Sequence, residues 1–445
     1  MYMKGISAMA KPLDRSVLSE KLALSNAIDS ALFDKFDVKR GLRNRDGSGV
    51  LAGLSRVSSV IGFHKVENEL KPVEGALKYR GISIQDIVAK FPVGSRFCFE
   101  QVTYFLLVGD FPTQEELATT LNFMATNRVL PDAIVSSVLT LPSMHVMNKL
   151  QTAISALYAY DETPDSIDAY ENFIKSLALI SRLPLIVAYG YLKAYKPQAK
   201  LVLPPAEMSV AESFLYVLHE GAIPDPFDVY VLDLCLVLHA EHGGGNNSTF
   251  ATRVVTSSES DLYSAMAAAV GSLKGPLHGS ANKKVMEMMA DIMANLPRYE
   301  DMDALRAYLL KILGKETFDK SGKLYGLGHA VYTKSDPRSL ILTAYARRLA
   351  GEKGRQRELD LYFAIAEMAP VLFQEVKGND KIIAPNVDFF SGFVYDCLGI
   401  PEPLYTPIFG LARAAGWCAH RIEELVSAKR IIRPAYKYVE SSLGV

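Results

Sequence analysis

Cysteine is scarce in this sequence, and that scarcity narrows the kind of protein it can be. The 445 residues contain four cysteines, at Cys98, Cys235, Cys397 and Cys418. They are widely spaced, form no C-x-x-C pair and have mostly apolar neighbours, so we expect buried, reduced thiols. This pattern fits a reducing, cytoplasmic location.

The sequence also lacks a surplus of charge of either sign. Lysine and arginine total 48, aspartate and glutamate total 49, and the formal net charge is -1. A chain without a basic field has no general means of attracting a phosphate backbone. Nucleic acid is therefore not an expected partner.

Long apolar runs are missing too. The stretch Leu177–Leu192 is interrupted by Arg182 and Pro184 before it reaches the roughly 18 residues that a membrane helix needs. The segment Met1–Ala10 has too little continuous apolar sequence for a signal peptide, and the acidic Asp14 follows soon after it. We expect no membrane span and no targeting peptide.

Strand signals are few, whereas apolar residues recur at helical spacing through most of the chain. Short β-branched or alternating stretches occur only near Arg56–Phe63 and Leu77–Arg80. With 445 residues, 49% of them hydrophobic, the chain can build two domains. We predict a mainly α fold with a minor β-hairpin, preceded by a polar leader, residues 1–50, that has one helical stretch at Ser16–Phe36.

Capping residues locate several helices. A capping-box pattern predicts a helix over 113–127. An N-cap and a first-turn proline at 225–226 predict a helix that would run to the glycines at 243–245 and carry His239 and His242 on its last turn. Further helices are expected at 261–273, directly after His278 with Ser280 or Asn282 as its cap, and near 300–314, 336–350, 356–376, 388–398 and 407–428.

Several common catalytic motifs are absent. The segment His242–Gly245 resembles the oxyanion segment of some esterases, but the chain has no G-x-S-x-G nucleophile elbow and no glycine-rich phosphate loop. A metal hydrolase stays open as an alternative, because His239, His242 and His278 could supply three ligands, although no H-E-x-x-H motif is present. Otherwise His239 would pack against or cap the helix end.

Three segments place an ionisable residue beside glycine or proline, where a ligand can approach the backbone closely. They are Gly275–Gly279, Gly326–Val331 with Asp336–Arg338, and Pro385–Asp388. These segments closely resemble signatures of the citrate synthase family, as do Leu238–His242, Asn247–Phe250 and Glu74–Gly81. The likeness runs from about Gly53 to the C-terminus and implies a helical, cofactor-free and metal-free enzyme that joins acetyl-CoA to oxaloacetate.

The resemblance implies that His278, His329 and Asp388 are the catalytic residues. The methyl proton next to a thioester has a pKa far above that of any side-chain base, so two groups must act together. Asp388 would take the proton while neutral His278, at a helix N-terminus, donates a hydrogen bond to the thioester oxygen. His329 would polarise the ketone. Considered alone, His278 would be a capping residue and Asp388 the N-cap of its helix.

A second group of residues is implied for substrate binding. Oxaloacetate carries two carboxylates, which planar guanidinium groups bind through paired hydrogen bonds. The resemblance assigns this role to Arg338, Arg413 and Arg433, with His242 also contacting the keto acid. Arg433 matches a segment that reaches the neighbouring subunit's site, which implies a homodimer. Without the resemblance, Arg413 and Arg433 would be surface cations or salt-bridge partners.

For the CoA portion, the resemblance implies that the turn containing Gly326 and Gly328 wraps the adenine through backbone groups. Many relatives carry a basic residue within a few positions after the histidine that matches His329, whereas this chain has Ala330 and Thr333, with Lys334 next. The phosphate contacts therefore stay open.

The resemblance also implies a large domain, 50–281 with 389–445, and a small inserted domain, 282–388, that closes over the site to exclude water.

Two alternatives concern the reaction itself. A 2-methylcitrate synthase would use the same residues on propionyl-CoA, because one methylene is worth only ~1 to 3 kcal/mol. A non-catalytic binding protein of the same fold would have no reason to keep His278, His329 and Asp388 together.

Overall fold

The computed structural model describes residues 15–440 apart from 68, 280 and 379–382, so the predicted cap Ser280 lies outside the described residues. The chain forms two compact units. One contains the residues up to Ala52 and those from Arg433 onward, and the other runs from Gly53 to Ile432. Each is described by itself.

The smaller unit contains two helices where the sequence predicted one. They are α1 (Arg15–Asn26) and α2 (Ser30–Lys35), followed by a 3-10 turn at Arg40–Leu42. The prediction of one stretch over Ser16–Phe36 was wrong, because the Asp29 carboxylate accepts the Ala31 N–H at 2.9 Å and starts a new helix.

The larger unit is mainly helical, which confirms the predicted fold class. Its three-stranded antiparallel sheet comprises β1 (Ser58–Val66), β2 (Glu69–Tyr79) and β3 (Ile82–Ser83), in that order. The second strand begins well before the predicted Leu77, because pairing with β1 extends it through Pro72 and Gly75, which have low strand propensity.

Its helices follow in chain order. They are α3 (Ile84–Ala89), α4 (Cys98–Val108), α5 (Gln114–Asn127), α6 (Val146–Leu157), α7 (Ala169–Tyr195), α8 (Val210–Leu218), α9 (Pro226–His239), α10 (Asn247–Thr256), α11 (Leu262–Leu273), α12 (Ala281–Asn295), α13 (Met302–Leu313), α14 (Pro337–Glu352), α15 (Gln356–Lys377), α16 (Val387–Cys397) and α17 (Tyr405–Ser427). Short 3-10 turns occur at Tyr158–Tyr160 and Glu402–Leu404, and a π-helical turn at Ile134–Val138.

Three of the predicted helix starts are confirmed. Thr113 and Glu116 form the predicted capping box at the start of α5. Asp225 caps α9 and Asp261 caps α11 through their side chains. Each of these contacts joins residues less than one turn apart, so the sequence alone was enough to predict them.

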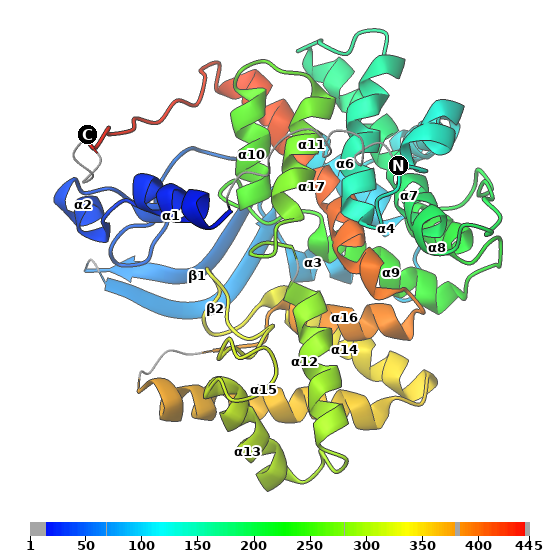
Figure 1. Ribbon diagram of the computed structural model, residues 1–445. Coiled ribbons are helices and arrows are strands. Elements are labelled where there is room, and N and C mark those ends of the chain that lie inside the picture. The colour runs from blue at the N-terminus through cyan, green and yellow to red at the C-terminus, as the bar shows by residue number, and fades with distance from the viewer. Residues whose placement is uncertain (1–14, 68, 280, 379–382, 441–445) are drawn as a thin grey trace. The chain divides into compact units, whose positions relative to one another are not determined.

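Helix α17 forms the centre of the larger unit. It packs against α4, α7, α9, α10 and α11, and its residues from Gly410 to Arg421 are buried. Figure 1 shows α12 to α15 grouped together below these helices, with α16 packed between α12 and α14. Helix α7 is the one described helix long and apolar enough to cross a membrane, but most of it is buried in the protein.

Candidate active site

His242 lies in the loop that follows α9, not on the last turn of that helix as predicted. The helix ends at His239, because the Tyr79 hydroxyl of β2 lies 3.1 Å from the carbonyl oxygens of both Val237 and Glu241 and anchors the chain there. The buried His242 ring faces His329, with a ring-centroid distance of 5.2 Å. Its Nε2 has no hydrogen-bond partner within the described part of the chain.

His329 is held by its own loop in one tautomer. Its Nδ1 accepts the backbone N–H groups of Val331 at 3.0 Å and Tyr332 at 3.1 Å. A neutral ring whose Nδ1 accepts two hydrogen bonds must carry its proton on Nε2. His329 can therefore donate a hydrogen bond from Nε2.

Gly326 lets the same loop approach α16. Gly326 has a φ of +76°, and a Cβ there would lie 2.7 Å from Val285 and 2.8 Å from a ring carbon of Phe389. Leu327 pairs with Pro385 in an isolated β-bridge, and the Gly328 N–H donates to the Ala384 carbonyl at 2.8 Å. The loop that carries His329 is thus fastened to the segment that leads into α16.

Asp388 is not the N-cap of α16. That place belongs to Asn386, whose side chain accepts the Asp388 N–H at 2.9 Å. The Asp388 carboxylate lies in the first helical turn, half-buried. Burial raises the pKa of Asp388 to about 6, although the charges of Arg338 and Arg413 act in the opposite direction. A carboxylate poised near neutral pH is a suitable general base.

Arg338 and Asp336 form a buried ion pair at the start of α14. Arg338 donates from Nε at 3.0 Å and from Nη2 at 2.7 Å to the two carboxylate oxygens of Asp336. Burial alone would lower the pKa of Arg338, but the Asp336 carboxylate raises it above its ordinary value. Asp336 also accepts the Val387 N–H at 3.1 Å, which joins the N-termini of α14 and α16.

Arg413 is different, because it is buried without a carboxylate bound to its terminal nitrogens. Its Nε donates to the His239 carbonyl at 2.6 Å. Neither Nη1 nor Nη2 has a hydrogen-bond partner among the described residues. Burial lowers the pKa of Arg413 to about 10. A buried guanidinium with two such donor groups can bind an anion.

His278 lies in the predicted tight connection before α12. Its Nε2 is 3.1 Å from the hydroxyl of Ser248, on α10. Burial, followed by the charge of Arg413, lowers the pKa of His278 to about 4, so the ring is neutral at physiological pH. No role was predicted for Ser248 from the sequence, although the family-like segment Asn247–Phe250 contains it.

The predicted site residues of the larger unit lie close together. Burial lowers the pKa of His242 well below its ordinary value, and the nearby charges of Arg338, His329 and Arg413 act in the same direction. Arg433 belongs to the smaller unit, where it is exposed. Tyr332 was not predicted, yet its ring stacks on His329 with centroids 4.8 Å apart, and its hydroxyl has no partner among the described residues.

A hollow of about 560 Å³ opens beside these residues. It is lined by Pro276, Leu277, Ala281, Lys284, Lys323, Leu324, Tyr325, Gly326, Leu327, Gly328, His329, Ala330, Phe373, Ile383 and Asn386. Leu277 is almost fully exposed at its edge. The basic residues of this lining are Lys284, which pairs with Glu287 at 2.6 Å, and Lys323.

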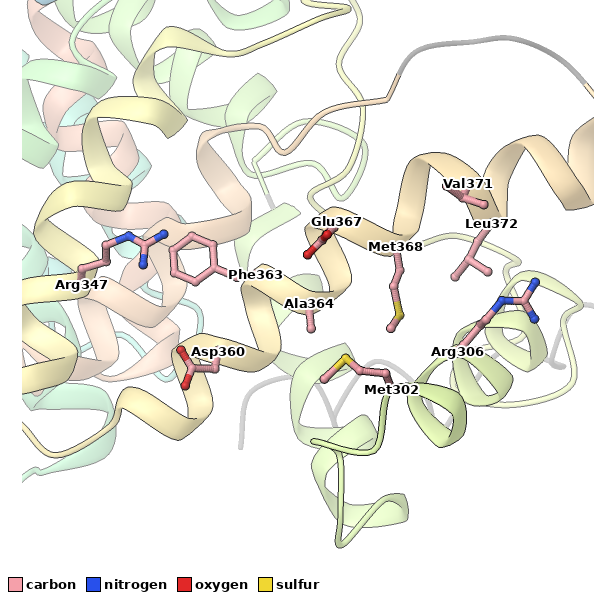
Figure 2. A pocket seen from close by; sticks show the side chains of 10 residues that line it. All are labelled: Met302, Arg306, Arg347, Asp360, Phe363, Ala364, Glu367, Met368, Val371 and Leu372. Carbon is pink, nitrogen blue, oxygen red and sulfur yellow. The ribbon is translucent and has the colours of Figure 1, made fainter.

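A second hollow, of about 630 Å³, contains none of the predicted residues (Figure 2). It lies among α13, α14 and α15. Its cations are already engaged within the protein: Arg306 pairs with Glu375 at 2.5 Å, and the Arg347 guanidinium lies 3.9 Å from the Phe363 ring centroid.

Among residues 15–440, less the gaps stated above, no group of three His, Cys, Asp or Glu is placed to hold a metal ion. His239 instead packs on Phe409, with ring centroids 4.6 Å apart.

We expect the neutral histidines to make the protein sensitive to acid. Burial holds the pKa of His239 well below its ordinary value and, with the charge of Arg413, that of His278 at about 4. Unfolded histidine binds a proton at about pH 6.5. The free energy of unfolding should therefore be highest above this pH and should decrease as the pH falls toward 4.

Urea unfolding at pH 7.5, 6.0 and 5.0 measures this loss. The midpoint should fall steadily with pH in the wild type and less steeply in His239→Gln, which has one titrating group fewer. Equal slopes in the two proteins would contradict the assignment of His239.

Comparison with known proteins places this arrangement in a family. Residues 46–435 match the model of the citrate synthase C-terminal domain. The citrate synthase of Deinococcus radiodurans is 38% identical over 366 residues, which cover 82% of this chain and 90% of that protein. The 2-methylcitrate synthase of Mycobacterium tuberculosis is 34% identical over 428 residues, 95% of each chain.

Solved structures agree with these sequence matches. The citrate synthase of Pyrobaculum aerophilum has a TM-score of 0.72 at 32% identity, covering 89% of this chain and 92% of its own. That of Thermoplasma acidophilum, in a ternary complex with carboxymethyl coenzyme A and oxaloacetate, has a TM-score of 0.74 at 28% identity, covering 92% and 97%. The chain thus belongs to the citrate synthase family of acyltransferases, which convert an acyl group into an alkyl group on transfer.

Proposed function

We propose that this chain condenses acetyl-CoA with oxaloacetate and water to give citrate and CoA, without a cofactor. The observation that carries the proposal is the buried guanidinium of Arg413, whose two Nη groups have no partner among the described residues. It lies near the equally unpartnered Nε2 of His242, whose pKa is lowered by burial and further by the charge of Arg413. A dianionic keto acid would satisfy both groups.

Oxaloacetate binds first in this mechanism. Arg413 and Arg338 hold its carboxylates, while His329 and His242 face its ketone. The Nε2–H of His329 donates to the ketone oxygen and makes the carbonyl carbon more electrophilic. His242 is neutral at working pH, so it adds a hydrogen bond without adding a charge that would compete with the arginines.

Enolisation of the thioester needs a base and a matched donor. Asp388, with a pKa of about 6, is ionised at neutral pH and takes a proton from the acetyl methyl group. His278, with a pKa of about 4, stays neutral and donates to the thioester oxygen. The enolate carbon then bonds to the ketone carbon, and the ketone oxygen takes the Nε2 proton of His329, which the proton removed by Asp388 replaces. Water then hydrolyses the citryl thioester, leaving its hydroxyl group on citrate and its remaining proton on the CoA thiol.

The hollow beside His329 is the proposed place of CoA. Its lining includes the turn with Gly326 and Gly328, which the family resemblance assigns to the adenine. Lys323 supplies positive charge for the phosphates where Ala330 and Thr333 do not, and Lys284 can add to it by exchanging its pairing with Glu287 for a phosphate.

The division into a large domain, 50–281 with 389–445, and a small domain, 282–388, stays a prediction. The grouping of α12 to α15 supports it (Figure 1). We further propose a homodimer in which Arg433 completes the neighbouring site. The four buried, unpaired cysteines support a cytoplasmic location.

Thiol release tests the function. Purified protein is mixed with oxaloacetate and either acetyl-CoA or propionyl-CoA, with a chelator present. We expect release that depends on oxaloacetate, with kcat/KM higher for acetyl-CoA. A higher value for propionyl-CoA would make the chain a 2-methylcitrate synthase, the activity named for one relative. Release from neither thioester would contradict both assignments.

A further inference from the structure

The single tryptophan of the chain contacts the site through a hydroxyl group. Trp417 is buried in α17, one turn beyond Arg413, and its Nε1–H donates to the Ser248 hydroxyl at 3.1 Å. The same hydroxyl lies 3.1 Å from Nε2 of His278. Indole, hydroxyl and imidazole thus form a continuous chain of hydrogen bonds from α17 to the catalytic loop.

The direction of this chain decides which nitrogen of His278 is protonated. Ser248 has one hydroxyl proton and two possible acceptors, Oδ1 of Asn246 at 2.9 Å and Nε2 of His278 at 3.1 Å. If the proton points to Asn246, Nε2 of His278 must carry a hydrogen and Nδ1 a lone pair. If it points to His278, Nδ1 carries the hydrogen and can donate to a substrate.

Trp417 favours the second direction. An indole N–H can only donate, so it always occupies a lone pair of the Ser248 oxygen. Donation into that oxygen polarises the O–H group and strengthens its own donation, which is greatest toward the more basic acceptor, an imidazole nitrogen. In the opposite direction, the Ser248 oxygen would accept from both Trp417 and His278, and its proton would go to the amide oxygen of Asn246, a weaker acceptor than a neutral imidazole nitrogen.

The two helices that hold the tryptophan and the serine are fixed to each other. One turn beyond Trp417, His420 of α17 lies 2.8 Å from Oε1 of Glu241 and 2.6 Å from Nη2 of Arg253, which belongs to α10. Arg253 also donates to Glu424 of α17 at 2.6 Å. Polar groups held on rigid helices by buried pairs keep their geometry within the narrow limits that a relay needs.

We propose that Trp417 is a positioning residue that, through Ser248, keeps His278 in the neutral tautomer protonated at Nδ1. The proposal rests on the proposed function in one respect, the donation from His278 to the thioester oxygen. The tautomer itself is a property of the free enzyme. Trp417 touches no substrate and acts on catalysis only through the serine.

Nitrogen NMR of the substrate-free enzyme tests the tautomer directly. In protein labelled with 15N-histidine, the His278 signals, assigned by their loss in His278→Gln, should show a protonated Nδ1 and an unprotonated Nε2. In Trp417→Phe, which keeps an aromatic ring but removes the donor, a substantial share of the signal should move to the Nε2-protonated form. A wild-type ring protonated at Nε2, or a pattern unchanged in Trp417→Phe, would overturn the proposal.

Kinetics supply the second readout. Loss of one hydrogen bond to a neutral group should lower kcat for thiol release by roughly fivefold with the KM for oxaloacetate unchanged. Ser248→Ala should lower kcat as well, and adding Trp417→Phe to it should change nothing further, because the relay is already broken. Fully additive effects would contradict the relay.

A matched control separates tautomer control from packing. Tyr189→Phe removes a buried aromatic donor from α7, where the hydroxyl bonds the Val202 carbonyl at 2.8 Å, and should leave the His278 signals and kcat unchanged. If Trp417→Phe does not fold, the lone tryptophan can be replaced by 3-benzothienylalanine, which has nearly the same shape and no N–H. Normal tautomer signals in a wild-type protein that releases no thiol would refute the proposed function and leave the relay standing.

Discussion

The Asp388→Asn variant should lose about a thousandfold in kcat for thiol release, because a positioned general base contributes roughly 10² to 10⁴ in rate. Asparagine keeps the size of the side chain and the helix, whose cap is Asn386, so the fold should persist. The loss should appear in kcat, with oxaloacetate binding nearly intact. Steady-state kinetics with both substrates varied measures the two effects separately.

The pH profile of the wild type follows from the same group. The acid form of Asp388 cannot accept a proton, and burial raises its pKa to about 6. The value of kcat/KM should therefore rise through pH 6 and level off above it. A profile that is flat between pH 5 and 7 would contradict the role of Asp388.

The Asp388→Asn variant should be more stable than the wild type although it is less active. An acid whose pKa is raised in the folded state opposes folding at pH values above its unfolded pKa. Asp388→Asn should consequently unfold at higher urea concentration than the wild type at pH 7 to 8, and this advantage should vanish near pH 4. The control Asp396→Asn changes an exposed carboxylate on the same helix, paired with Arg355, and should keep full activity.

Arg413→Met should weaken oxaloacetate binding about one hundredfold. Charge-assisted hydrogen bonds of a guanidinium to a carboxylate are worth up to about 3 kcal/mol, and Arg413 has both Nη groups free of partners among the described residues. The KM for oxaloacetate should rise, and the thermal stabilisation that oxaloacetate gives the wild type should shrink accordingly. Differential scanning fluorimetry over a range of oxaloacetate concentrations measures it.

Replacing Arg413 and replacing Arg338 by methionine should affect the stability of the fold differently. Burial lowers the pKa of Arg413 to about 10, which means that the fold disfavours its charged form. Without oxaloacetate bound, the Arg413→Met protein should therefore be as stable as the wild type. Arg338→Met would leave the buried Asp336 carboxylate unpaired and should cost about 3 kcal/mol. Equal destabilisation by both substitutions would contradict the assignment of Arg413 as an open anion site.

Sequence reasoning succeeded where a structure depends on near neighbours. The capping box of Thr113 and the cap at Asp225 were predictable, because each joins residues within one helical turn. His278, His329 and Asp388 each stand in a short glycine- or proline-containing run that resembles the family, and their catalytic roles stay predictions.

It failed where distant residues decide a local structure. Helix α9 ends before His242 because Tyr79 bonds Glu241, which is 162 positions away in the chain. The role of Ser248 depends on His278, 30 positions away, and on Trp417, 169 positions away. No periodicity or spacing rule connects such positions, so only the fold could reveal them.

The bridge between Leu327 and Pro385 has a mechanical consequence. The Asn386 N–H donates to the Gly326 carbonyl, and its side chain donates to the Gly328 carbonyl, both at 2.9 Å, so the loop of His329 and the start of α16 move as one piece. In the proposed mechanism, any hinge motion that carries Asp388 toward a thioester must therefore carry His329 along with it. The proposed base and the proposed activator of the ketone would then arrive together, and a short-lived enol would form only where its reaction partner is already in place.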